Sequence, residues 1–198
     1  MREVQSTDSP SLLCRLYVLT GNRQHSRNAR VDMASGKETT DEEEFLDDGC
    51  IFCLIANEED KEAEVIQRSN ELVCFKDICP AAPHHYLVVP RKHIMSCLLL
   101  NKEQIGLVEK MAEMGKDVLR ARGVTDMNDI SLGFHQPPYT SVDHLHLHVL
   151  APKSQISTLF AHKFIPDSPR FITERTLRRC LQEITPPHNC LFDCLSFF

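Results

Sequence analysis

The stretch His144-Leu145-His146-Leu147-His148-Val149-Leu150 decides the fold of this chain. Histidines alternate with aliphatic residues in it, and a strict period of two is typical of a β-strand. Successive side chains of a strand point to opposite faces, so the pattern predicts three imidazoles on one face and three aliphatic side chains in a core. An ordered row of imidazoles suits either a metal site or a site that attacks phosphorus.

Composition places the chain among ordinary soluble globular proteins. It has 198 residues, 25% of them charged and 42% hydrophobic, which predicts one domain with tails. The formal net charge of −6 argues against a general binder of long nucleic acids, and no uncharged run is long enough to cross a membrane. Arg15 interrupts the apolar stretch 12–19, so we expect no secretory signal. The nine cysteines are odd in number, and we interpret most of them as reduced core residues of an intracellular protein.

Three segments follow from the distribution of charge and apolar residues. Residues 1–48 end in an acidic run and predict a disordered tail, residues 49–152 form the compact domain, and residues 153–198 are a C-terminal extension. Short apolar runs predict strands at 72–75, 86–89 and 130–134, and helical spacing predicts a long helix at 101–122 and a short basic one at 173–183. The predicted class is α+β, with antiparallel strands and one long helix on a face.

The histidine strand supports two chemistries, and the residues alone leave both open. Imidazoles two apart on a strand can chelate zinc, and the C-x-x-C at Cys50 and Cys53 would complete a tetrahedral site, unless the two thiols are simply buried. Alternatively, a neutral imidazole can attack phosphorus if one ring nitrogen is free and an acceptor holds the other. Neighbouring histidines would then stabilise the phosphoryl oxygens or protonate the leaving group. The chain lacks a Walker-type glycine loop, which favours a small mononucleotide-type substrate.

The residues around the strand resemble the Hint branch of the histidine triad superfamily. Residues 144–150 match the signature His-φ-His-φ-His-φ-φ, where φ is hydrophobic, and the likeness continues upstream through 74–80, 83–94 and Ser141. It covers about half of the chain, residues 50–152. The resemblance implies the histidine triad fold: an antiparallel five-stranded sheet with one long helix, the sheet being continued across a homodimer. It leaves higher homo-oligomers open.

The resemblance also implies an activity. Members of this branch hydrolyse the P–N bond of adenosine 5′-monophosphoramidates, AMP linked to amines such as lysine, through a covalent AMP–histidine. A purine nucleotide phosphoramidate of AMP or GMP is thus the expected substrate, with no membrane and no long nucleic acid as partner. The alternatives are a hydrolase of dinucleoside polyphosphates or adenylylated ends, and a non-catalytic nucleotide-binding adaptor. A place in the cytoplasm and nucleus is expected for a chain of this kind.

By resemblance, the family's roles fall on numbered residues of this chain. His146 would be the nucleophile, His148 the hydrogen-bond donor to the phosphate, and His85 a support from the adjacent strand. Asp77 would accept from the ribose hydroxyls, Ile78 would pack beside the nucleoside, Ser141 would contact the leaving-group side, and Leu147 would complete the nucleotide-binding set. Alone, Asp77 would be interpreted as a turn cap.

Zinc is the one cofactor that the resemblance brings in, and catalysis does not require it. Some relatives hold a structural zinc through residues that correspond here to Cys50, Cys53, His93 and His144. His144 could therefore serve the active site or the metal. We interpret His84 and His135 as ordinary hydrogen-bonded histidines.

Two departures from the family pattern affect the phosphate and leaving-group side. Gly133 stands where the family has Asn, and Pro137-Pro138-Tyr139 replaces a glycine-rich loop. Leaving-group preference therefore stays open.

Overall fold

The structure is a computed structural model, and it describes residues 49–183. The predicted acidic tail and the last 15 residues of the C-terminal extension lie outside this range. Within it, no helix combines the length and the apolar character that a membrane span requires. The domain boundaries expected at 48 and 152 stay predictions.

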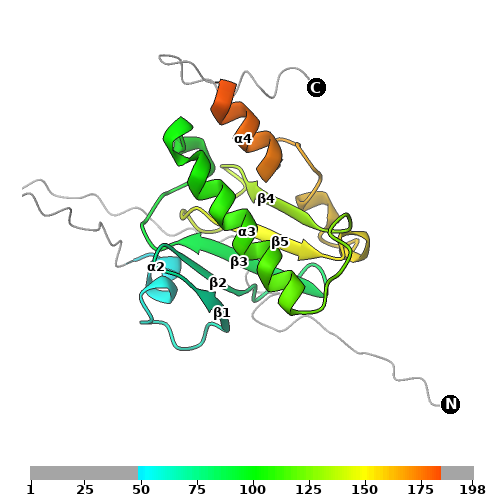
Figure 1. The fold of residues 1–198 in the computed structure, drawn as a ribbon, viewed down its shortest axis with the longest axis horizontal. Helices are drawn as coiled ribbons and strands as arrows, with labels where there is room; N and C mark the ends of the chain where they lie inside the picture. Colours follow the sequence, from blue (N-terminus) through cyan, green and yellow to red (C-terminus); the bar gives the residue numbers. More distant parts are fainter. Residues whose placement is uncertain (1–48, 184–198) are drawn as a thin grey trace, which may run out of the picture. The chain divides into compact units, whose positions relative to one another are not determined.

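Six strands and three α-helices make up the described part of the chain (Figure 1). The strands are β1 (Val65–Arg68), β2 (Leu72–Lys76), β3 (His84–Pro90), β4 (Ser131–His135), β5 (Leu147–Ala151) and β6 (Phe171–Thr173). The helices are α2 (Ile51–Ala56), α3 (Ile105–Ala121) and α4 (Glu174–Glu183). Four 3₁₀ turns lie at Cys97–Leu99, Lys102–Gln104, Lys153–Gln155 and Ala161–Lys163. This confirms the α+β class and the predicted helix in the C-terminal extension.

The sheet is antiparallel throughout, with the strand order β1-β2-β3-β5-β4-β6. The expected number of five strands is therefore wrong, because β6 pairs with the outer edge of β4 from Gly133↔Thr173 to His135↔Phe171. A strand of three residues is too short to display the alternation by which strands are predicted. Both edges of β4 are paired, and the outer strands of the sheet are therefore β1 and β6. The homodimer across which the sheet was expected to continue stays a prediction.

Gly133 explains why β6 can lie where it does. A Cβ atom at this position would come within 2.6 Å of the carbonyl oxygen of Ile172 and within 2.6 Å of the Phe171 ring. Real Cβ atoms do not approach other atoms so closely, so the glycine makes room for β6. The departure from the family's Asn thus accompanies the sixth strand.

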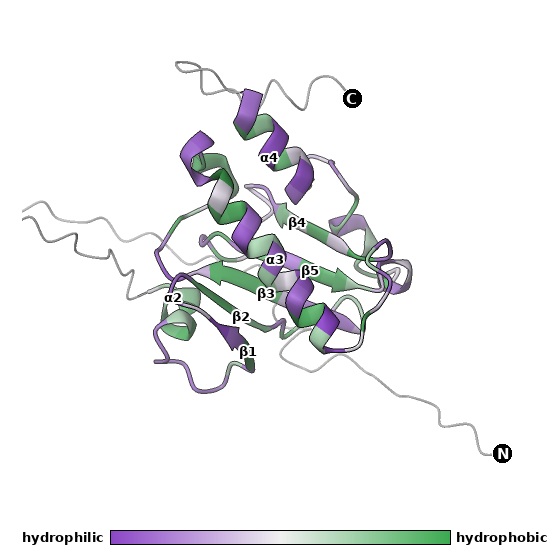
Figure 2. Cartoon of the chain, in the orientation of Figure 1, coloured by the Kyte–Doolittle hydropathy of each residue, from purple (hydrophilic) through white to green (hydrophobic). Residues whose placement is uncertain are grey.

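Helix α3 covers one face of the sheet, and α4 lies beside it (Figure 1). Asn101 caps the first turn, as expected, although this turn is 3₁₀ and the α-helix begins at Ile105. Leu145, Leu147 and Val149 are buried in the core beneath α3, which confirms the aliphatic face of the histidine strand. Strands β2, β3 and β5 are apolar along most of their length in Figure 2, because both of their faces are covered.

The opposite face of the sheet carries the histidines. Phe52 and Ile55 of α2 pack there against Leu87 and Val89, while Phe164 and Phe171 pack against Leu150. The three histidines are consequently buried and do not form an open surface. Strand β5 begins only at Leu147, so the expected strand at 144–150 is correct for its second half.

Candidate active site

His146 has the tautomer that a nucleophile needs. Its Nδ1 lies 2.6 Å from the carbonyl oxygen of His144, which can only accept, so the ring proton is on Nδ1 and the lone pair is on Nε2. Burial lowers the pKa of His146 from its ordinary value of 6.5, outweighing the opposite effects of that hydrogen bond and of Asp77. A neutral imidazole at pH 7 follows. The acceptor is the backbone carbonyl two residues earlier in the sequence.

His148 has the complementary tautomer, and a chain of hydrogen bonds sets it. The Ala81 amide donates to Nδ1 of His85 over 3.1 Å, which places the proton of His85 on Nε2. This Nε2 lies 2.9 Å from Nδ1 of His148, which therefore accepts and carries its own proton on Nε2. His85 thus supports the site from the adjacent strand β3.

The Nε2–H group of His148 is a hydrogen-bond donor without an acceptor among the described residues. Within residues 49–183, this nitrogen is the buried side-chain nitrogen or oxygen atom that lacks a hydrogen-bond partner. An unpaired buried donor is costly, so such groups concentrate where a ligand completes them. The rings of His146 and His148 are 5.0 Å apart between centroids. A phosphoryl group beside His146 could therefore accept from His148.

Burial also keeps His85 and His148 neutral. It lowers the pKa of His85 against the raising effect of Asp77 and of a backbone hydrogen bond at Cys79. It lowers the pKa of His148 still further, and His135, His146, His85 and Lys163 act in the same direction. The site therefore offers a phosphoryl group neutral N–H donors and a neutral nucleophile.

Asp77 occupies the turn that leads into β3. Its Oδ1 accepts from the Cys79 amide at 2.7 Å, as a turn cap does, and its Oδ2 lies 3.4 Å from His85 Nε2. Ile78 beside it is 67% exposed. Ser141 is exposed in the loop before the triad, and the Leu147 side chain is in the core beneath α3. The roles of all four in nucleotide binding stay predictions.

Three aromatic rings that the sequence did not bring into the site surround the histidines. The Phe52 ring lies 5.3 Å from that of His146, and the Phe164 ring lies 5.4 Å from that of His148. The His135 ring is 4.5 Å from that of His148. Phe164 comes from beyond residue 152, so part of the C-terminal extension packs against the histidines. No local signal identifies these residues, because the contacts depend on how strands and loops pair.

A small pocket adjoins His146. Its walls include residues of the loops before β5 and after β3 together with the end of β4: Met95, Ser96, Cys97, Phe134, His135, Thr140, His144, Leu145 and His146. Thr140, the residue before Ser141, lines it. The pocket therefore marks the loop 136–141 as a wall beside His146.

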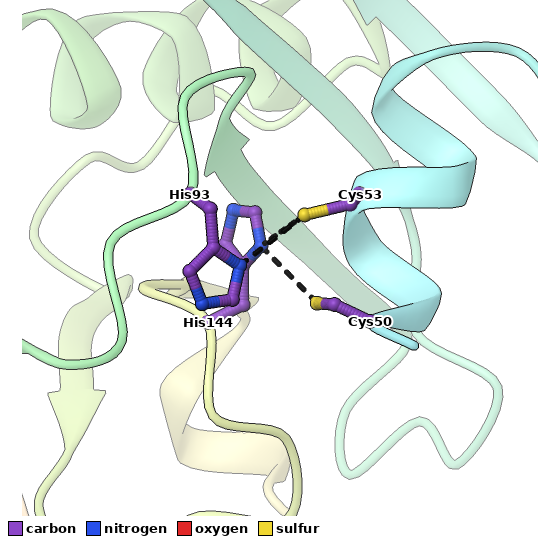
Figure 3. A group of neighbouring side chains, drawn as sticks. All are labelled: Cys50, Cys53, His93 and His144. Carbon is purple, nitrogen blue, oxygen red and sulfur yellow. Dashed lines mark hydrogen bonds between the residues drawn. The ribbon is translucent and has the colours of Figure 1, made fainter. Parts of the chain in front are cut away.

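The four residues expected to hold zinc come together (Figure 3). Nδ1 of His144 lies 3.4 Å from Cys50 Sγ and 3.5 Å from Cys53 Sγ, and Nδ1 of His93 lies 3.2 Å from Cys53 Sγ. With Zn–S about 2.3 Å and Zn–N about 2.0–2.1 Å, a tetrahedral site requires sulfur–nitrogen separations of about 3.6 Å. The donor set and its spacing fit a structural zinc ion.

His144 links this cluster to the active site. Its Nε2 donates to the carbonyl oxygen of Pro90 at 3.0 Å, which leaves Nδ1 directed at the thiols with its lone pair. Its ring therefore belongs to the Cys/His cluster, while its backbone carbonyl holds His146. Both cysteines lie on or next to α2, rather than on a strand.

Comparisons with known proteins agree with this geometry. A family model described as "Scavenger mRNA decapping enzyme C-term binding" matches residues 49–163. Over 122 residues the chain is 57% identical to a Danio rerio protein named adenosine 5′-monophosphoramidase HINT3, covering 62% of this chain and 76% of the relative. A Xenopus tropicalis protein of the same name is 47% identical over 149 residues, 75% of this chain and 97% of that one.

A solved structure shows the same fold. A histidine triad protein from Clostridium difficile superposes with a TM-score of 0.50 and 28% identity, over 54% of this chain and 92% of its own. The signature at 144–150, the buried pair of histidines with opposite tautomers, and the relatives all point to one family. The chain belongs to the histidine triad family.

Proposed function

We propose that the chain hydrolyses the P–N bond of adenosine 5′-monophosphoramidates and releases AMP and an amine. The observation that carries the proposal is the hydrogen bond of 2.6 Å from His146 Nδ1 to the His144 carbonyl, which directs a neutral Nε2 lone pair away from the backbone. Relatives that share 57% and 47% of their aligned residues with this chain are named for this activity.

The first step forms a covalent AMP–histidine. Nε2 of His146 forms a bond to phosphorus, and the electron pair of the P–N bond stays on the departing nitrogen, which takes a proton that derives from water. The Nε2–H group of His148 donates to a phosphoryl oxygen and stabilises the charge that gathers there. The positive charge that develops on the His146 ring is held by the carbonyl of His144.

The second step restores the enzyme. A water oxygen forms a bond to phosphorus, and the electron pair of the P–N bond to His146 returns to Nε2. One water molecule is consumed over both steps, its hydroxyl going to AMP and its proton to the amine. In this proposal Asp77 and Ile78 contact the nucleoside and Ser141 contacts the leaving-group side, as the resemblance implies. The proposal covers substrates that contain AMP or GMP.

A structural zinc ion belongs to the same proposal. Cys50, Cys53, His93 and His144 would hold it and thereby join α2 to the loops before β5 and after β3. When bound, the ion supplies a cross-link and no step of the reaction. A homodimer, and a place in the cytoplasm and nucleus, complete the proposal and rest on the resemblance alone. Light scattering after size-exclusion chromatography tests the dimer.

Turnover of a defined substrate tests the activity. The protein is incubated with an adenosine 5′-phosphoramidate of a primary amine, AMP release is followed by chromatography, and the protein is quenched in acid-free denaturant for mass spectrometry. We expect AMP and a protein adduct in the wild type, and neither in His146→Ala. His84→Asn is the control, because the His84 ring bonds to the Tyr86 hydroxyl outside the site. Unchanged turnover in His146→Ala would sink the assignment of the nucleophile.

Other substrates separate the alternatives. Cleavage of a dinucleoside polyphosphate in preference to the phosphoramidate would indicate the first alternative. Tight binding of AMP without turnover of either compound would indicate a nucleotide-binding adaptor.

A further inference from the structure

His135 is a histidine of the site to which the proposed mechanism gives no task. It ends β4, and its ring centroid is 4.5 Å from that of His148, 5.2 Å from that of Phe164 and 5.4 Å from that of Phe171. Along with His146 it lines the small pocket beside the nucleophile. An imidazole in this position borders the space directly beside His146.

The tautomer of His135 is determined by the backbone. Its Nδ1 lies 3.2 Å from the carbonyl oxygen of Arg170, and the Gln136 amide donates to the same oxygen at 3.0 Å. A carbonyl only accepts, so the proton of His135 is on Nδ1 and its Nε2 carries a lone pair. Within residues 49–183, no hydrogen bond to this Nε2 is present, and it is not among the buried atoms that lack a partner. His135 therefore presents an acceptor to a ligand.

His135 keeps this character at physiological pH. Burial lowers its pKa to about 4, and the nearby His146, Lys163 and His85 lower it as well, against the raising effect of the Arg170 carbonyl. A ring with this pKa is neutral at pH 7 and is a weak base. It acts neither as an acid nor as a strong general base, but as a fixed hydrogen-bond acceptor.

An acceptor in this pocket favours a particular partner. Phosphoryl oxygens carry negative charge and lone pairs, so they are repelled by the His135 lone pair, whereas His148 offers them a proton. A leaving nitrogen of the form P–NH–R carries a hydrogen that can be donated. An ester oxygen or a dialkylated nitrogen carries none. The pocket rim supplied by Met95, which is 53% exposed, suits an apolar substituent R.

We propose that His135 is a specificity-determining residue that accepts a hydrogen bond from the N–H of the scissile P–N bond. This inference rests on the proposed function and adds a substrate class to it: phosphoramidates of primary amines, in preference to phosphoramidates of secondary amines and to phosphate esters. Neutral hydrogen bonds discriminate by about 3- to 10-fold each. A preference of that size is attributed to His135.

The test compares two substrates on matched variants. The substrates are AMP linked to a primary alkylamine and AMP morpholidate, whose nitrogen has no hydrogen. His135→Asn retains an N–H group that can donate to the Arg170 carbonyl but lacks an acceptor at the position of Nε2. His135→Phe retains the ring that packs against His148 and Phe164. His84→Asn again serves as the control, and thermal unfolding verifies that each variant is folded.

The ratio of kcat/KM for the two substrates is the quantity that decides. In both His135 variants we expect kcat/KM to fall about 3- to 10-fold for the primary-amine substrate and to stay unchanged for the morpholidate. An equal fall for both substrates would show that His135 only supports His148, and it would overturn the inference while the proposed function stands. Absence of turnover of both substrates by the wild type would overturn the proposed function, and the inference with it.

Discussion

Replacing His85 should remove the hydrogen bond that keeps the proton of His148 on Nε2, where the proposed mechanism uses it to bind the phosphate. In His85→Leu, His148 Nδ1 loses the donor now 2.9 Å away, and the Ala81 amide loses the acceptor now 3.1 Å away. Each buried group left without a partner costs about 1–3 kcal/mol, so the free energy of unfolding should fall by about 2–6 kcal/mol. Without the Nε2–H of His85, the proton of His148 is no longer held on its Nε2.

Activity should fall further than stability suggests. Loss of one preorganised donor to a developing oxyanion typically lowers kcat by about 10²- to 10³-fold, and we expect a fall of that size in His85→Leu. His85→Gln is the matched variant, because its amide N–H can reach His148 Nδ1 while the Ala81 amide still lacks an acceptor. It should recover much of the activity but only part of the stability.

Urea denaturation and AMP release from an adenosine phosphoramidate measure the two quantities separately. Wild-type kcat/KM in folded His85→Leu would refute the hydrogen-bond chain. A Gln variant as inactive as the Leu variant would refute it as well, because only Gln supplies an N–H donor to His148 Nδ1.

Three further predictions address the metal, the pH dependence and the packing of α4. Purified protein should bind one zinc per chain by elemental analysis, and Cys53→Ala should abolish binding; Cys97→Ala should not, since burial raises the pKa of that thiol to about 12. The pKa of His135 is about 4 in the folded protein and about 6.5 in the unfolded chain, so between these pH values the unfolded chain binds the extra proton and the free energy of unfolding falls as the pH falls. The contribution of His135 to stability is therefore complete above pH 6.5 and is lost below it. His135→Phe should lessen this fall in the free energy of unfolding by about 1.4 kcal/mol per pH unit. Arg178→Met should cost about 1–3 kcal/mol in urea denaturation, because buried Glu174 loses its partner at 2.8 Å, whereas Lys116→Met, from an exposed ion pair, should cost under about 1 kcal/mol.

Periodicity in the sequence predicted the parts of the fold that have a strong local pattern. The aliphatic face of the histidine strand and the helix α3 are of this kind, since alternation and helical spacing persist over many residues. Strand β6 has three residues and gains its place from β4, so no local pattern indicates it. The burial of the histidine face also depends on α2 and on the segment around Phe164, which are distant in the sequence.

The candidate site likewise contains residues that the sequence could identify and residues whose place depends on distant parts of the chain. Resemblance assigned roles to His85, His146 and His148, and in the structure these three rings are neighbours and make hydrogen bonds that set their tautomers. His135 was interpreted as an ordinary histidine because its importance follows from the pairing of β4 with β5, where Gly133 lies opposite His148. A register between strands that are eleven residues apart along the chain cannot be obtained from the composition of either.

Gly133 and Phe171 have a consequence for how this chain can change. A side chain at 133 would meet two obstacles, the ring of Phe171 and the backbone carbonyl oxygen of Ile172, and only the ring can be removed by a substitution. Epistasis between the two positions should therefore be partial: Gly133→Asn should be severe while Phe171 is in place and should stay clearly destabilising in Phe171→Gly, because the Ile172 carbonyl oxygen is still there. The glycine at 133 is thus required by the backbone of β6 as well as by one neighbouring side chain, so no single compensating substitution should make a larger residue acceptable there.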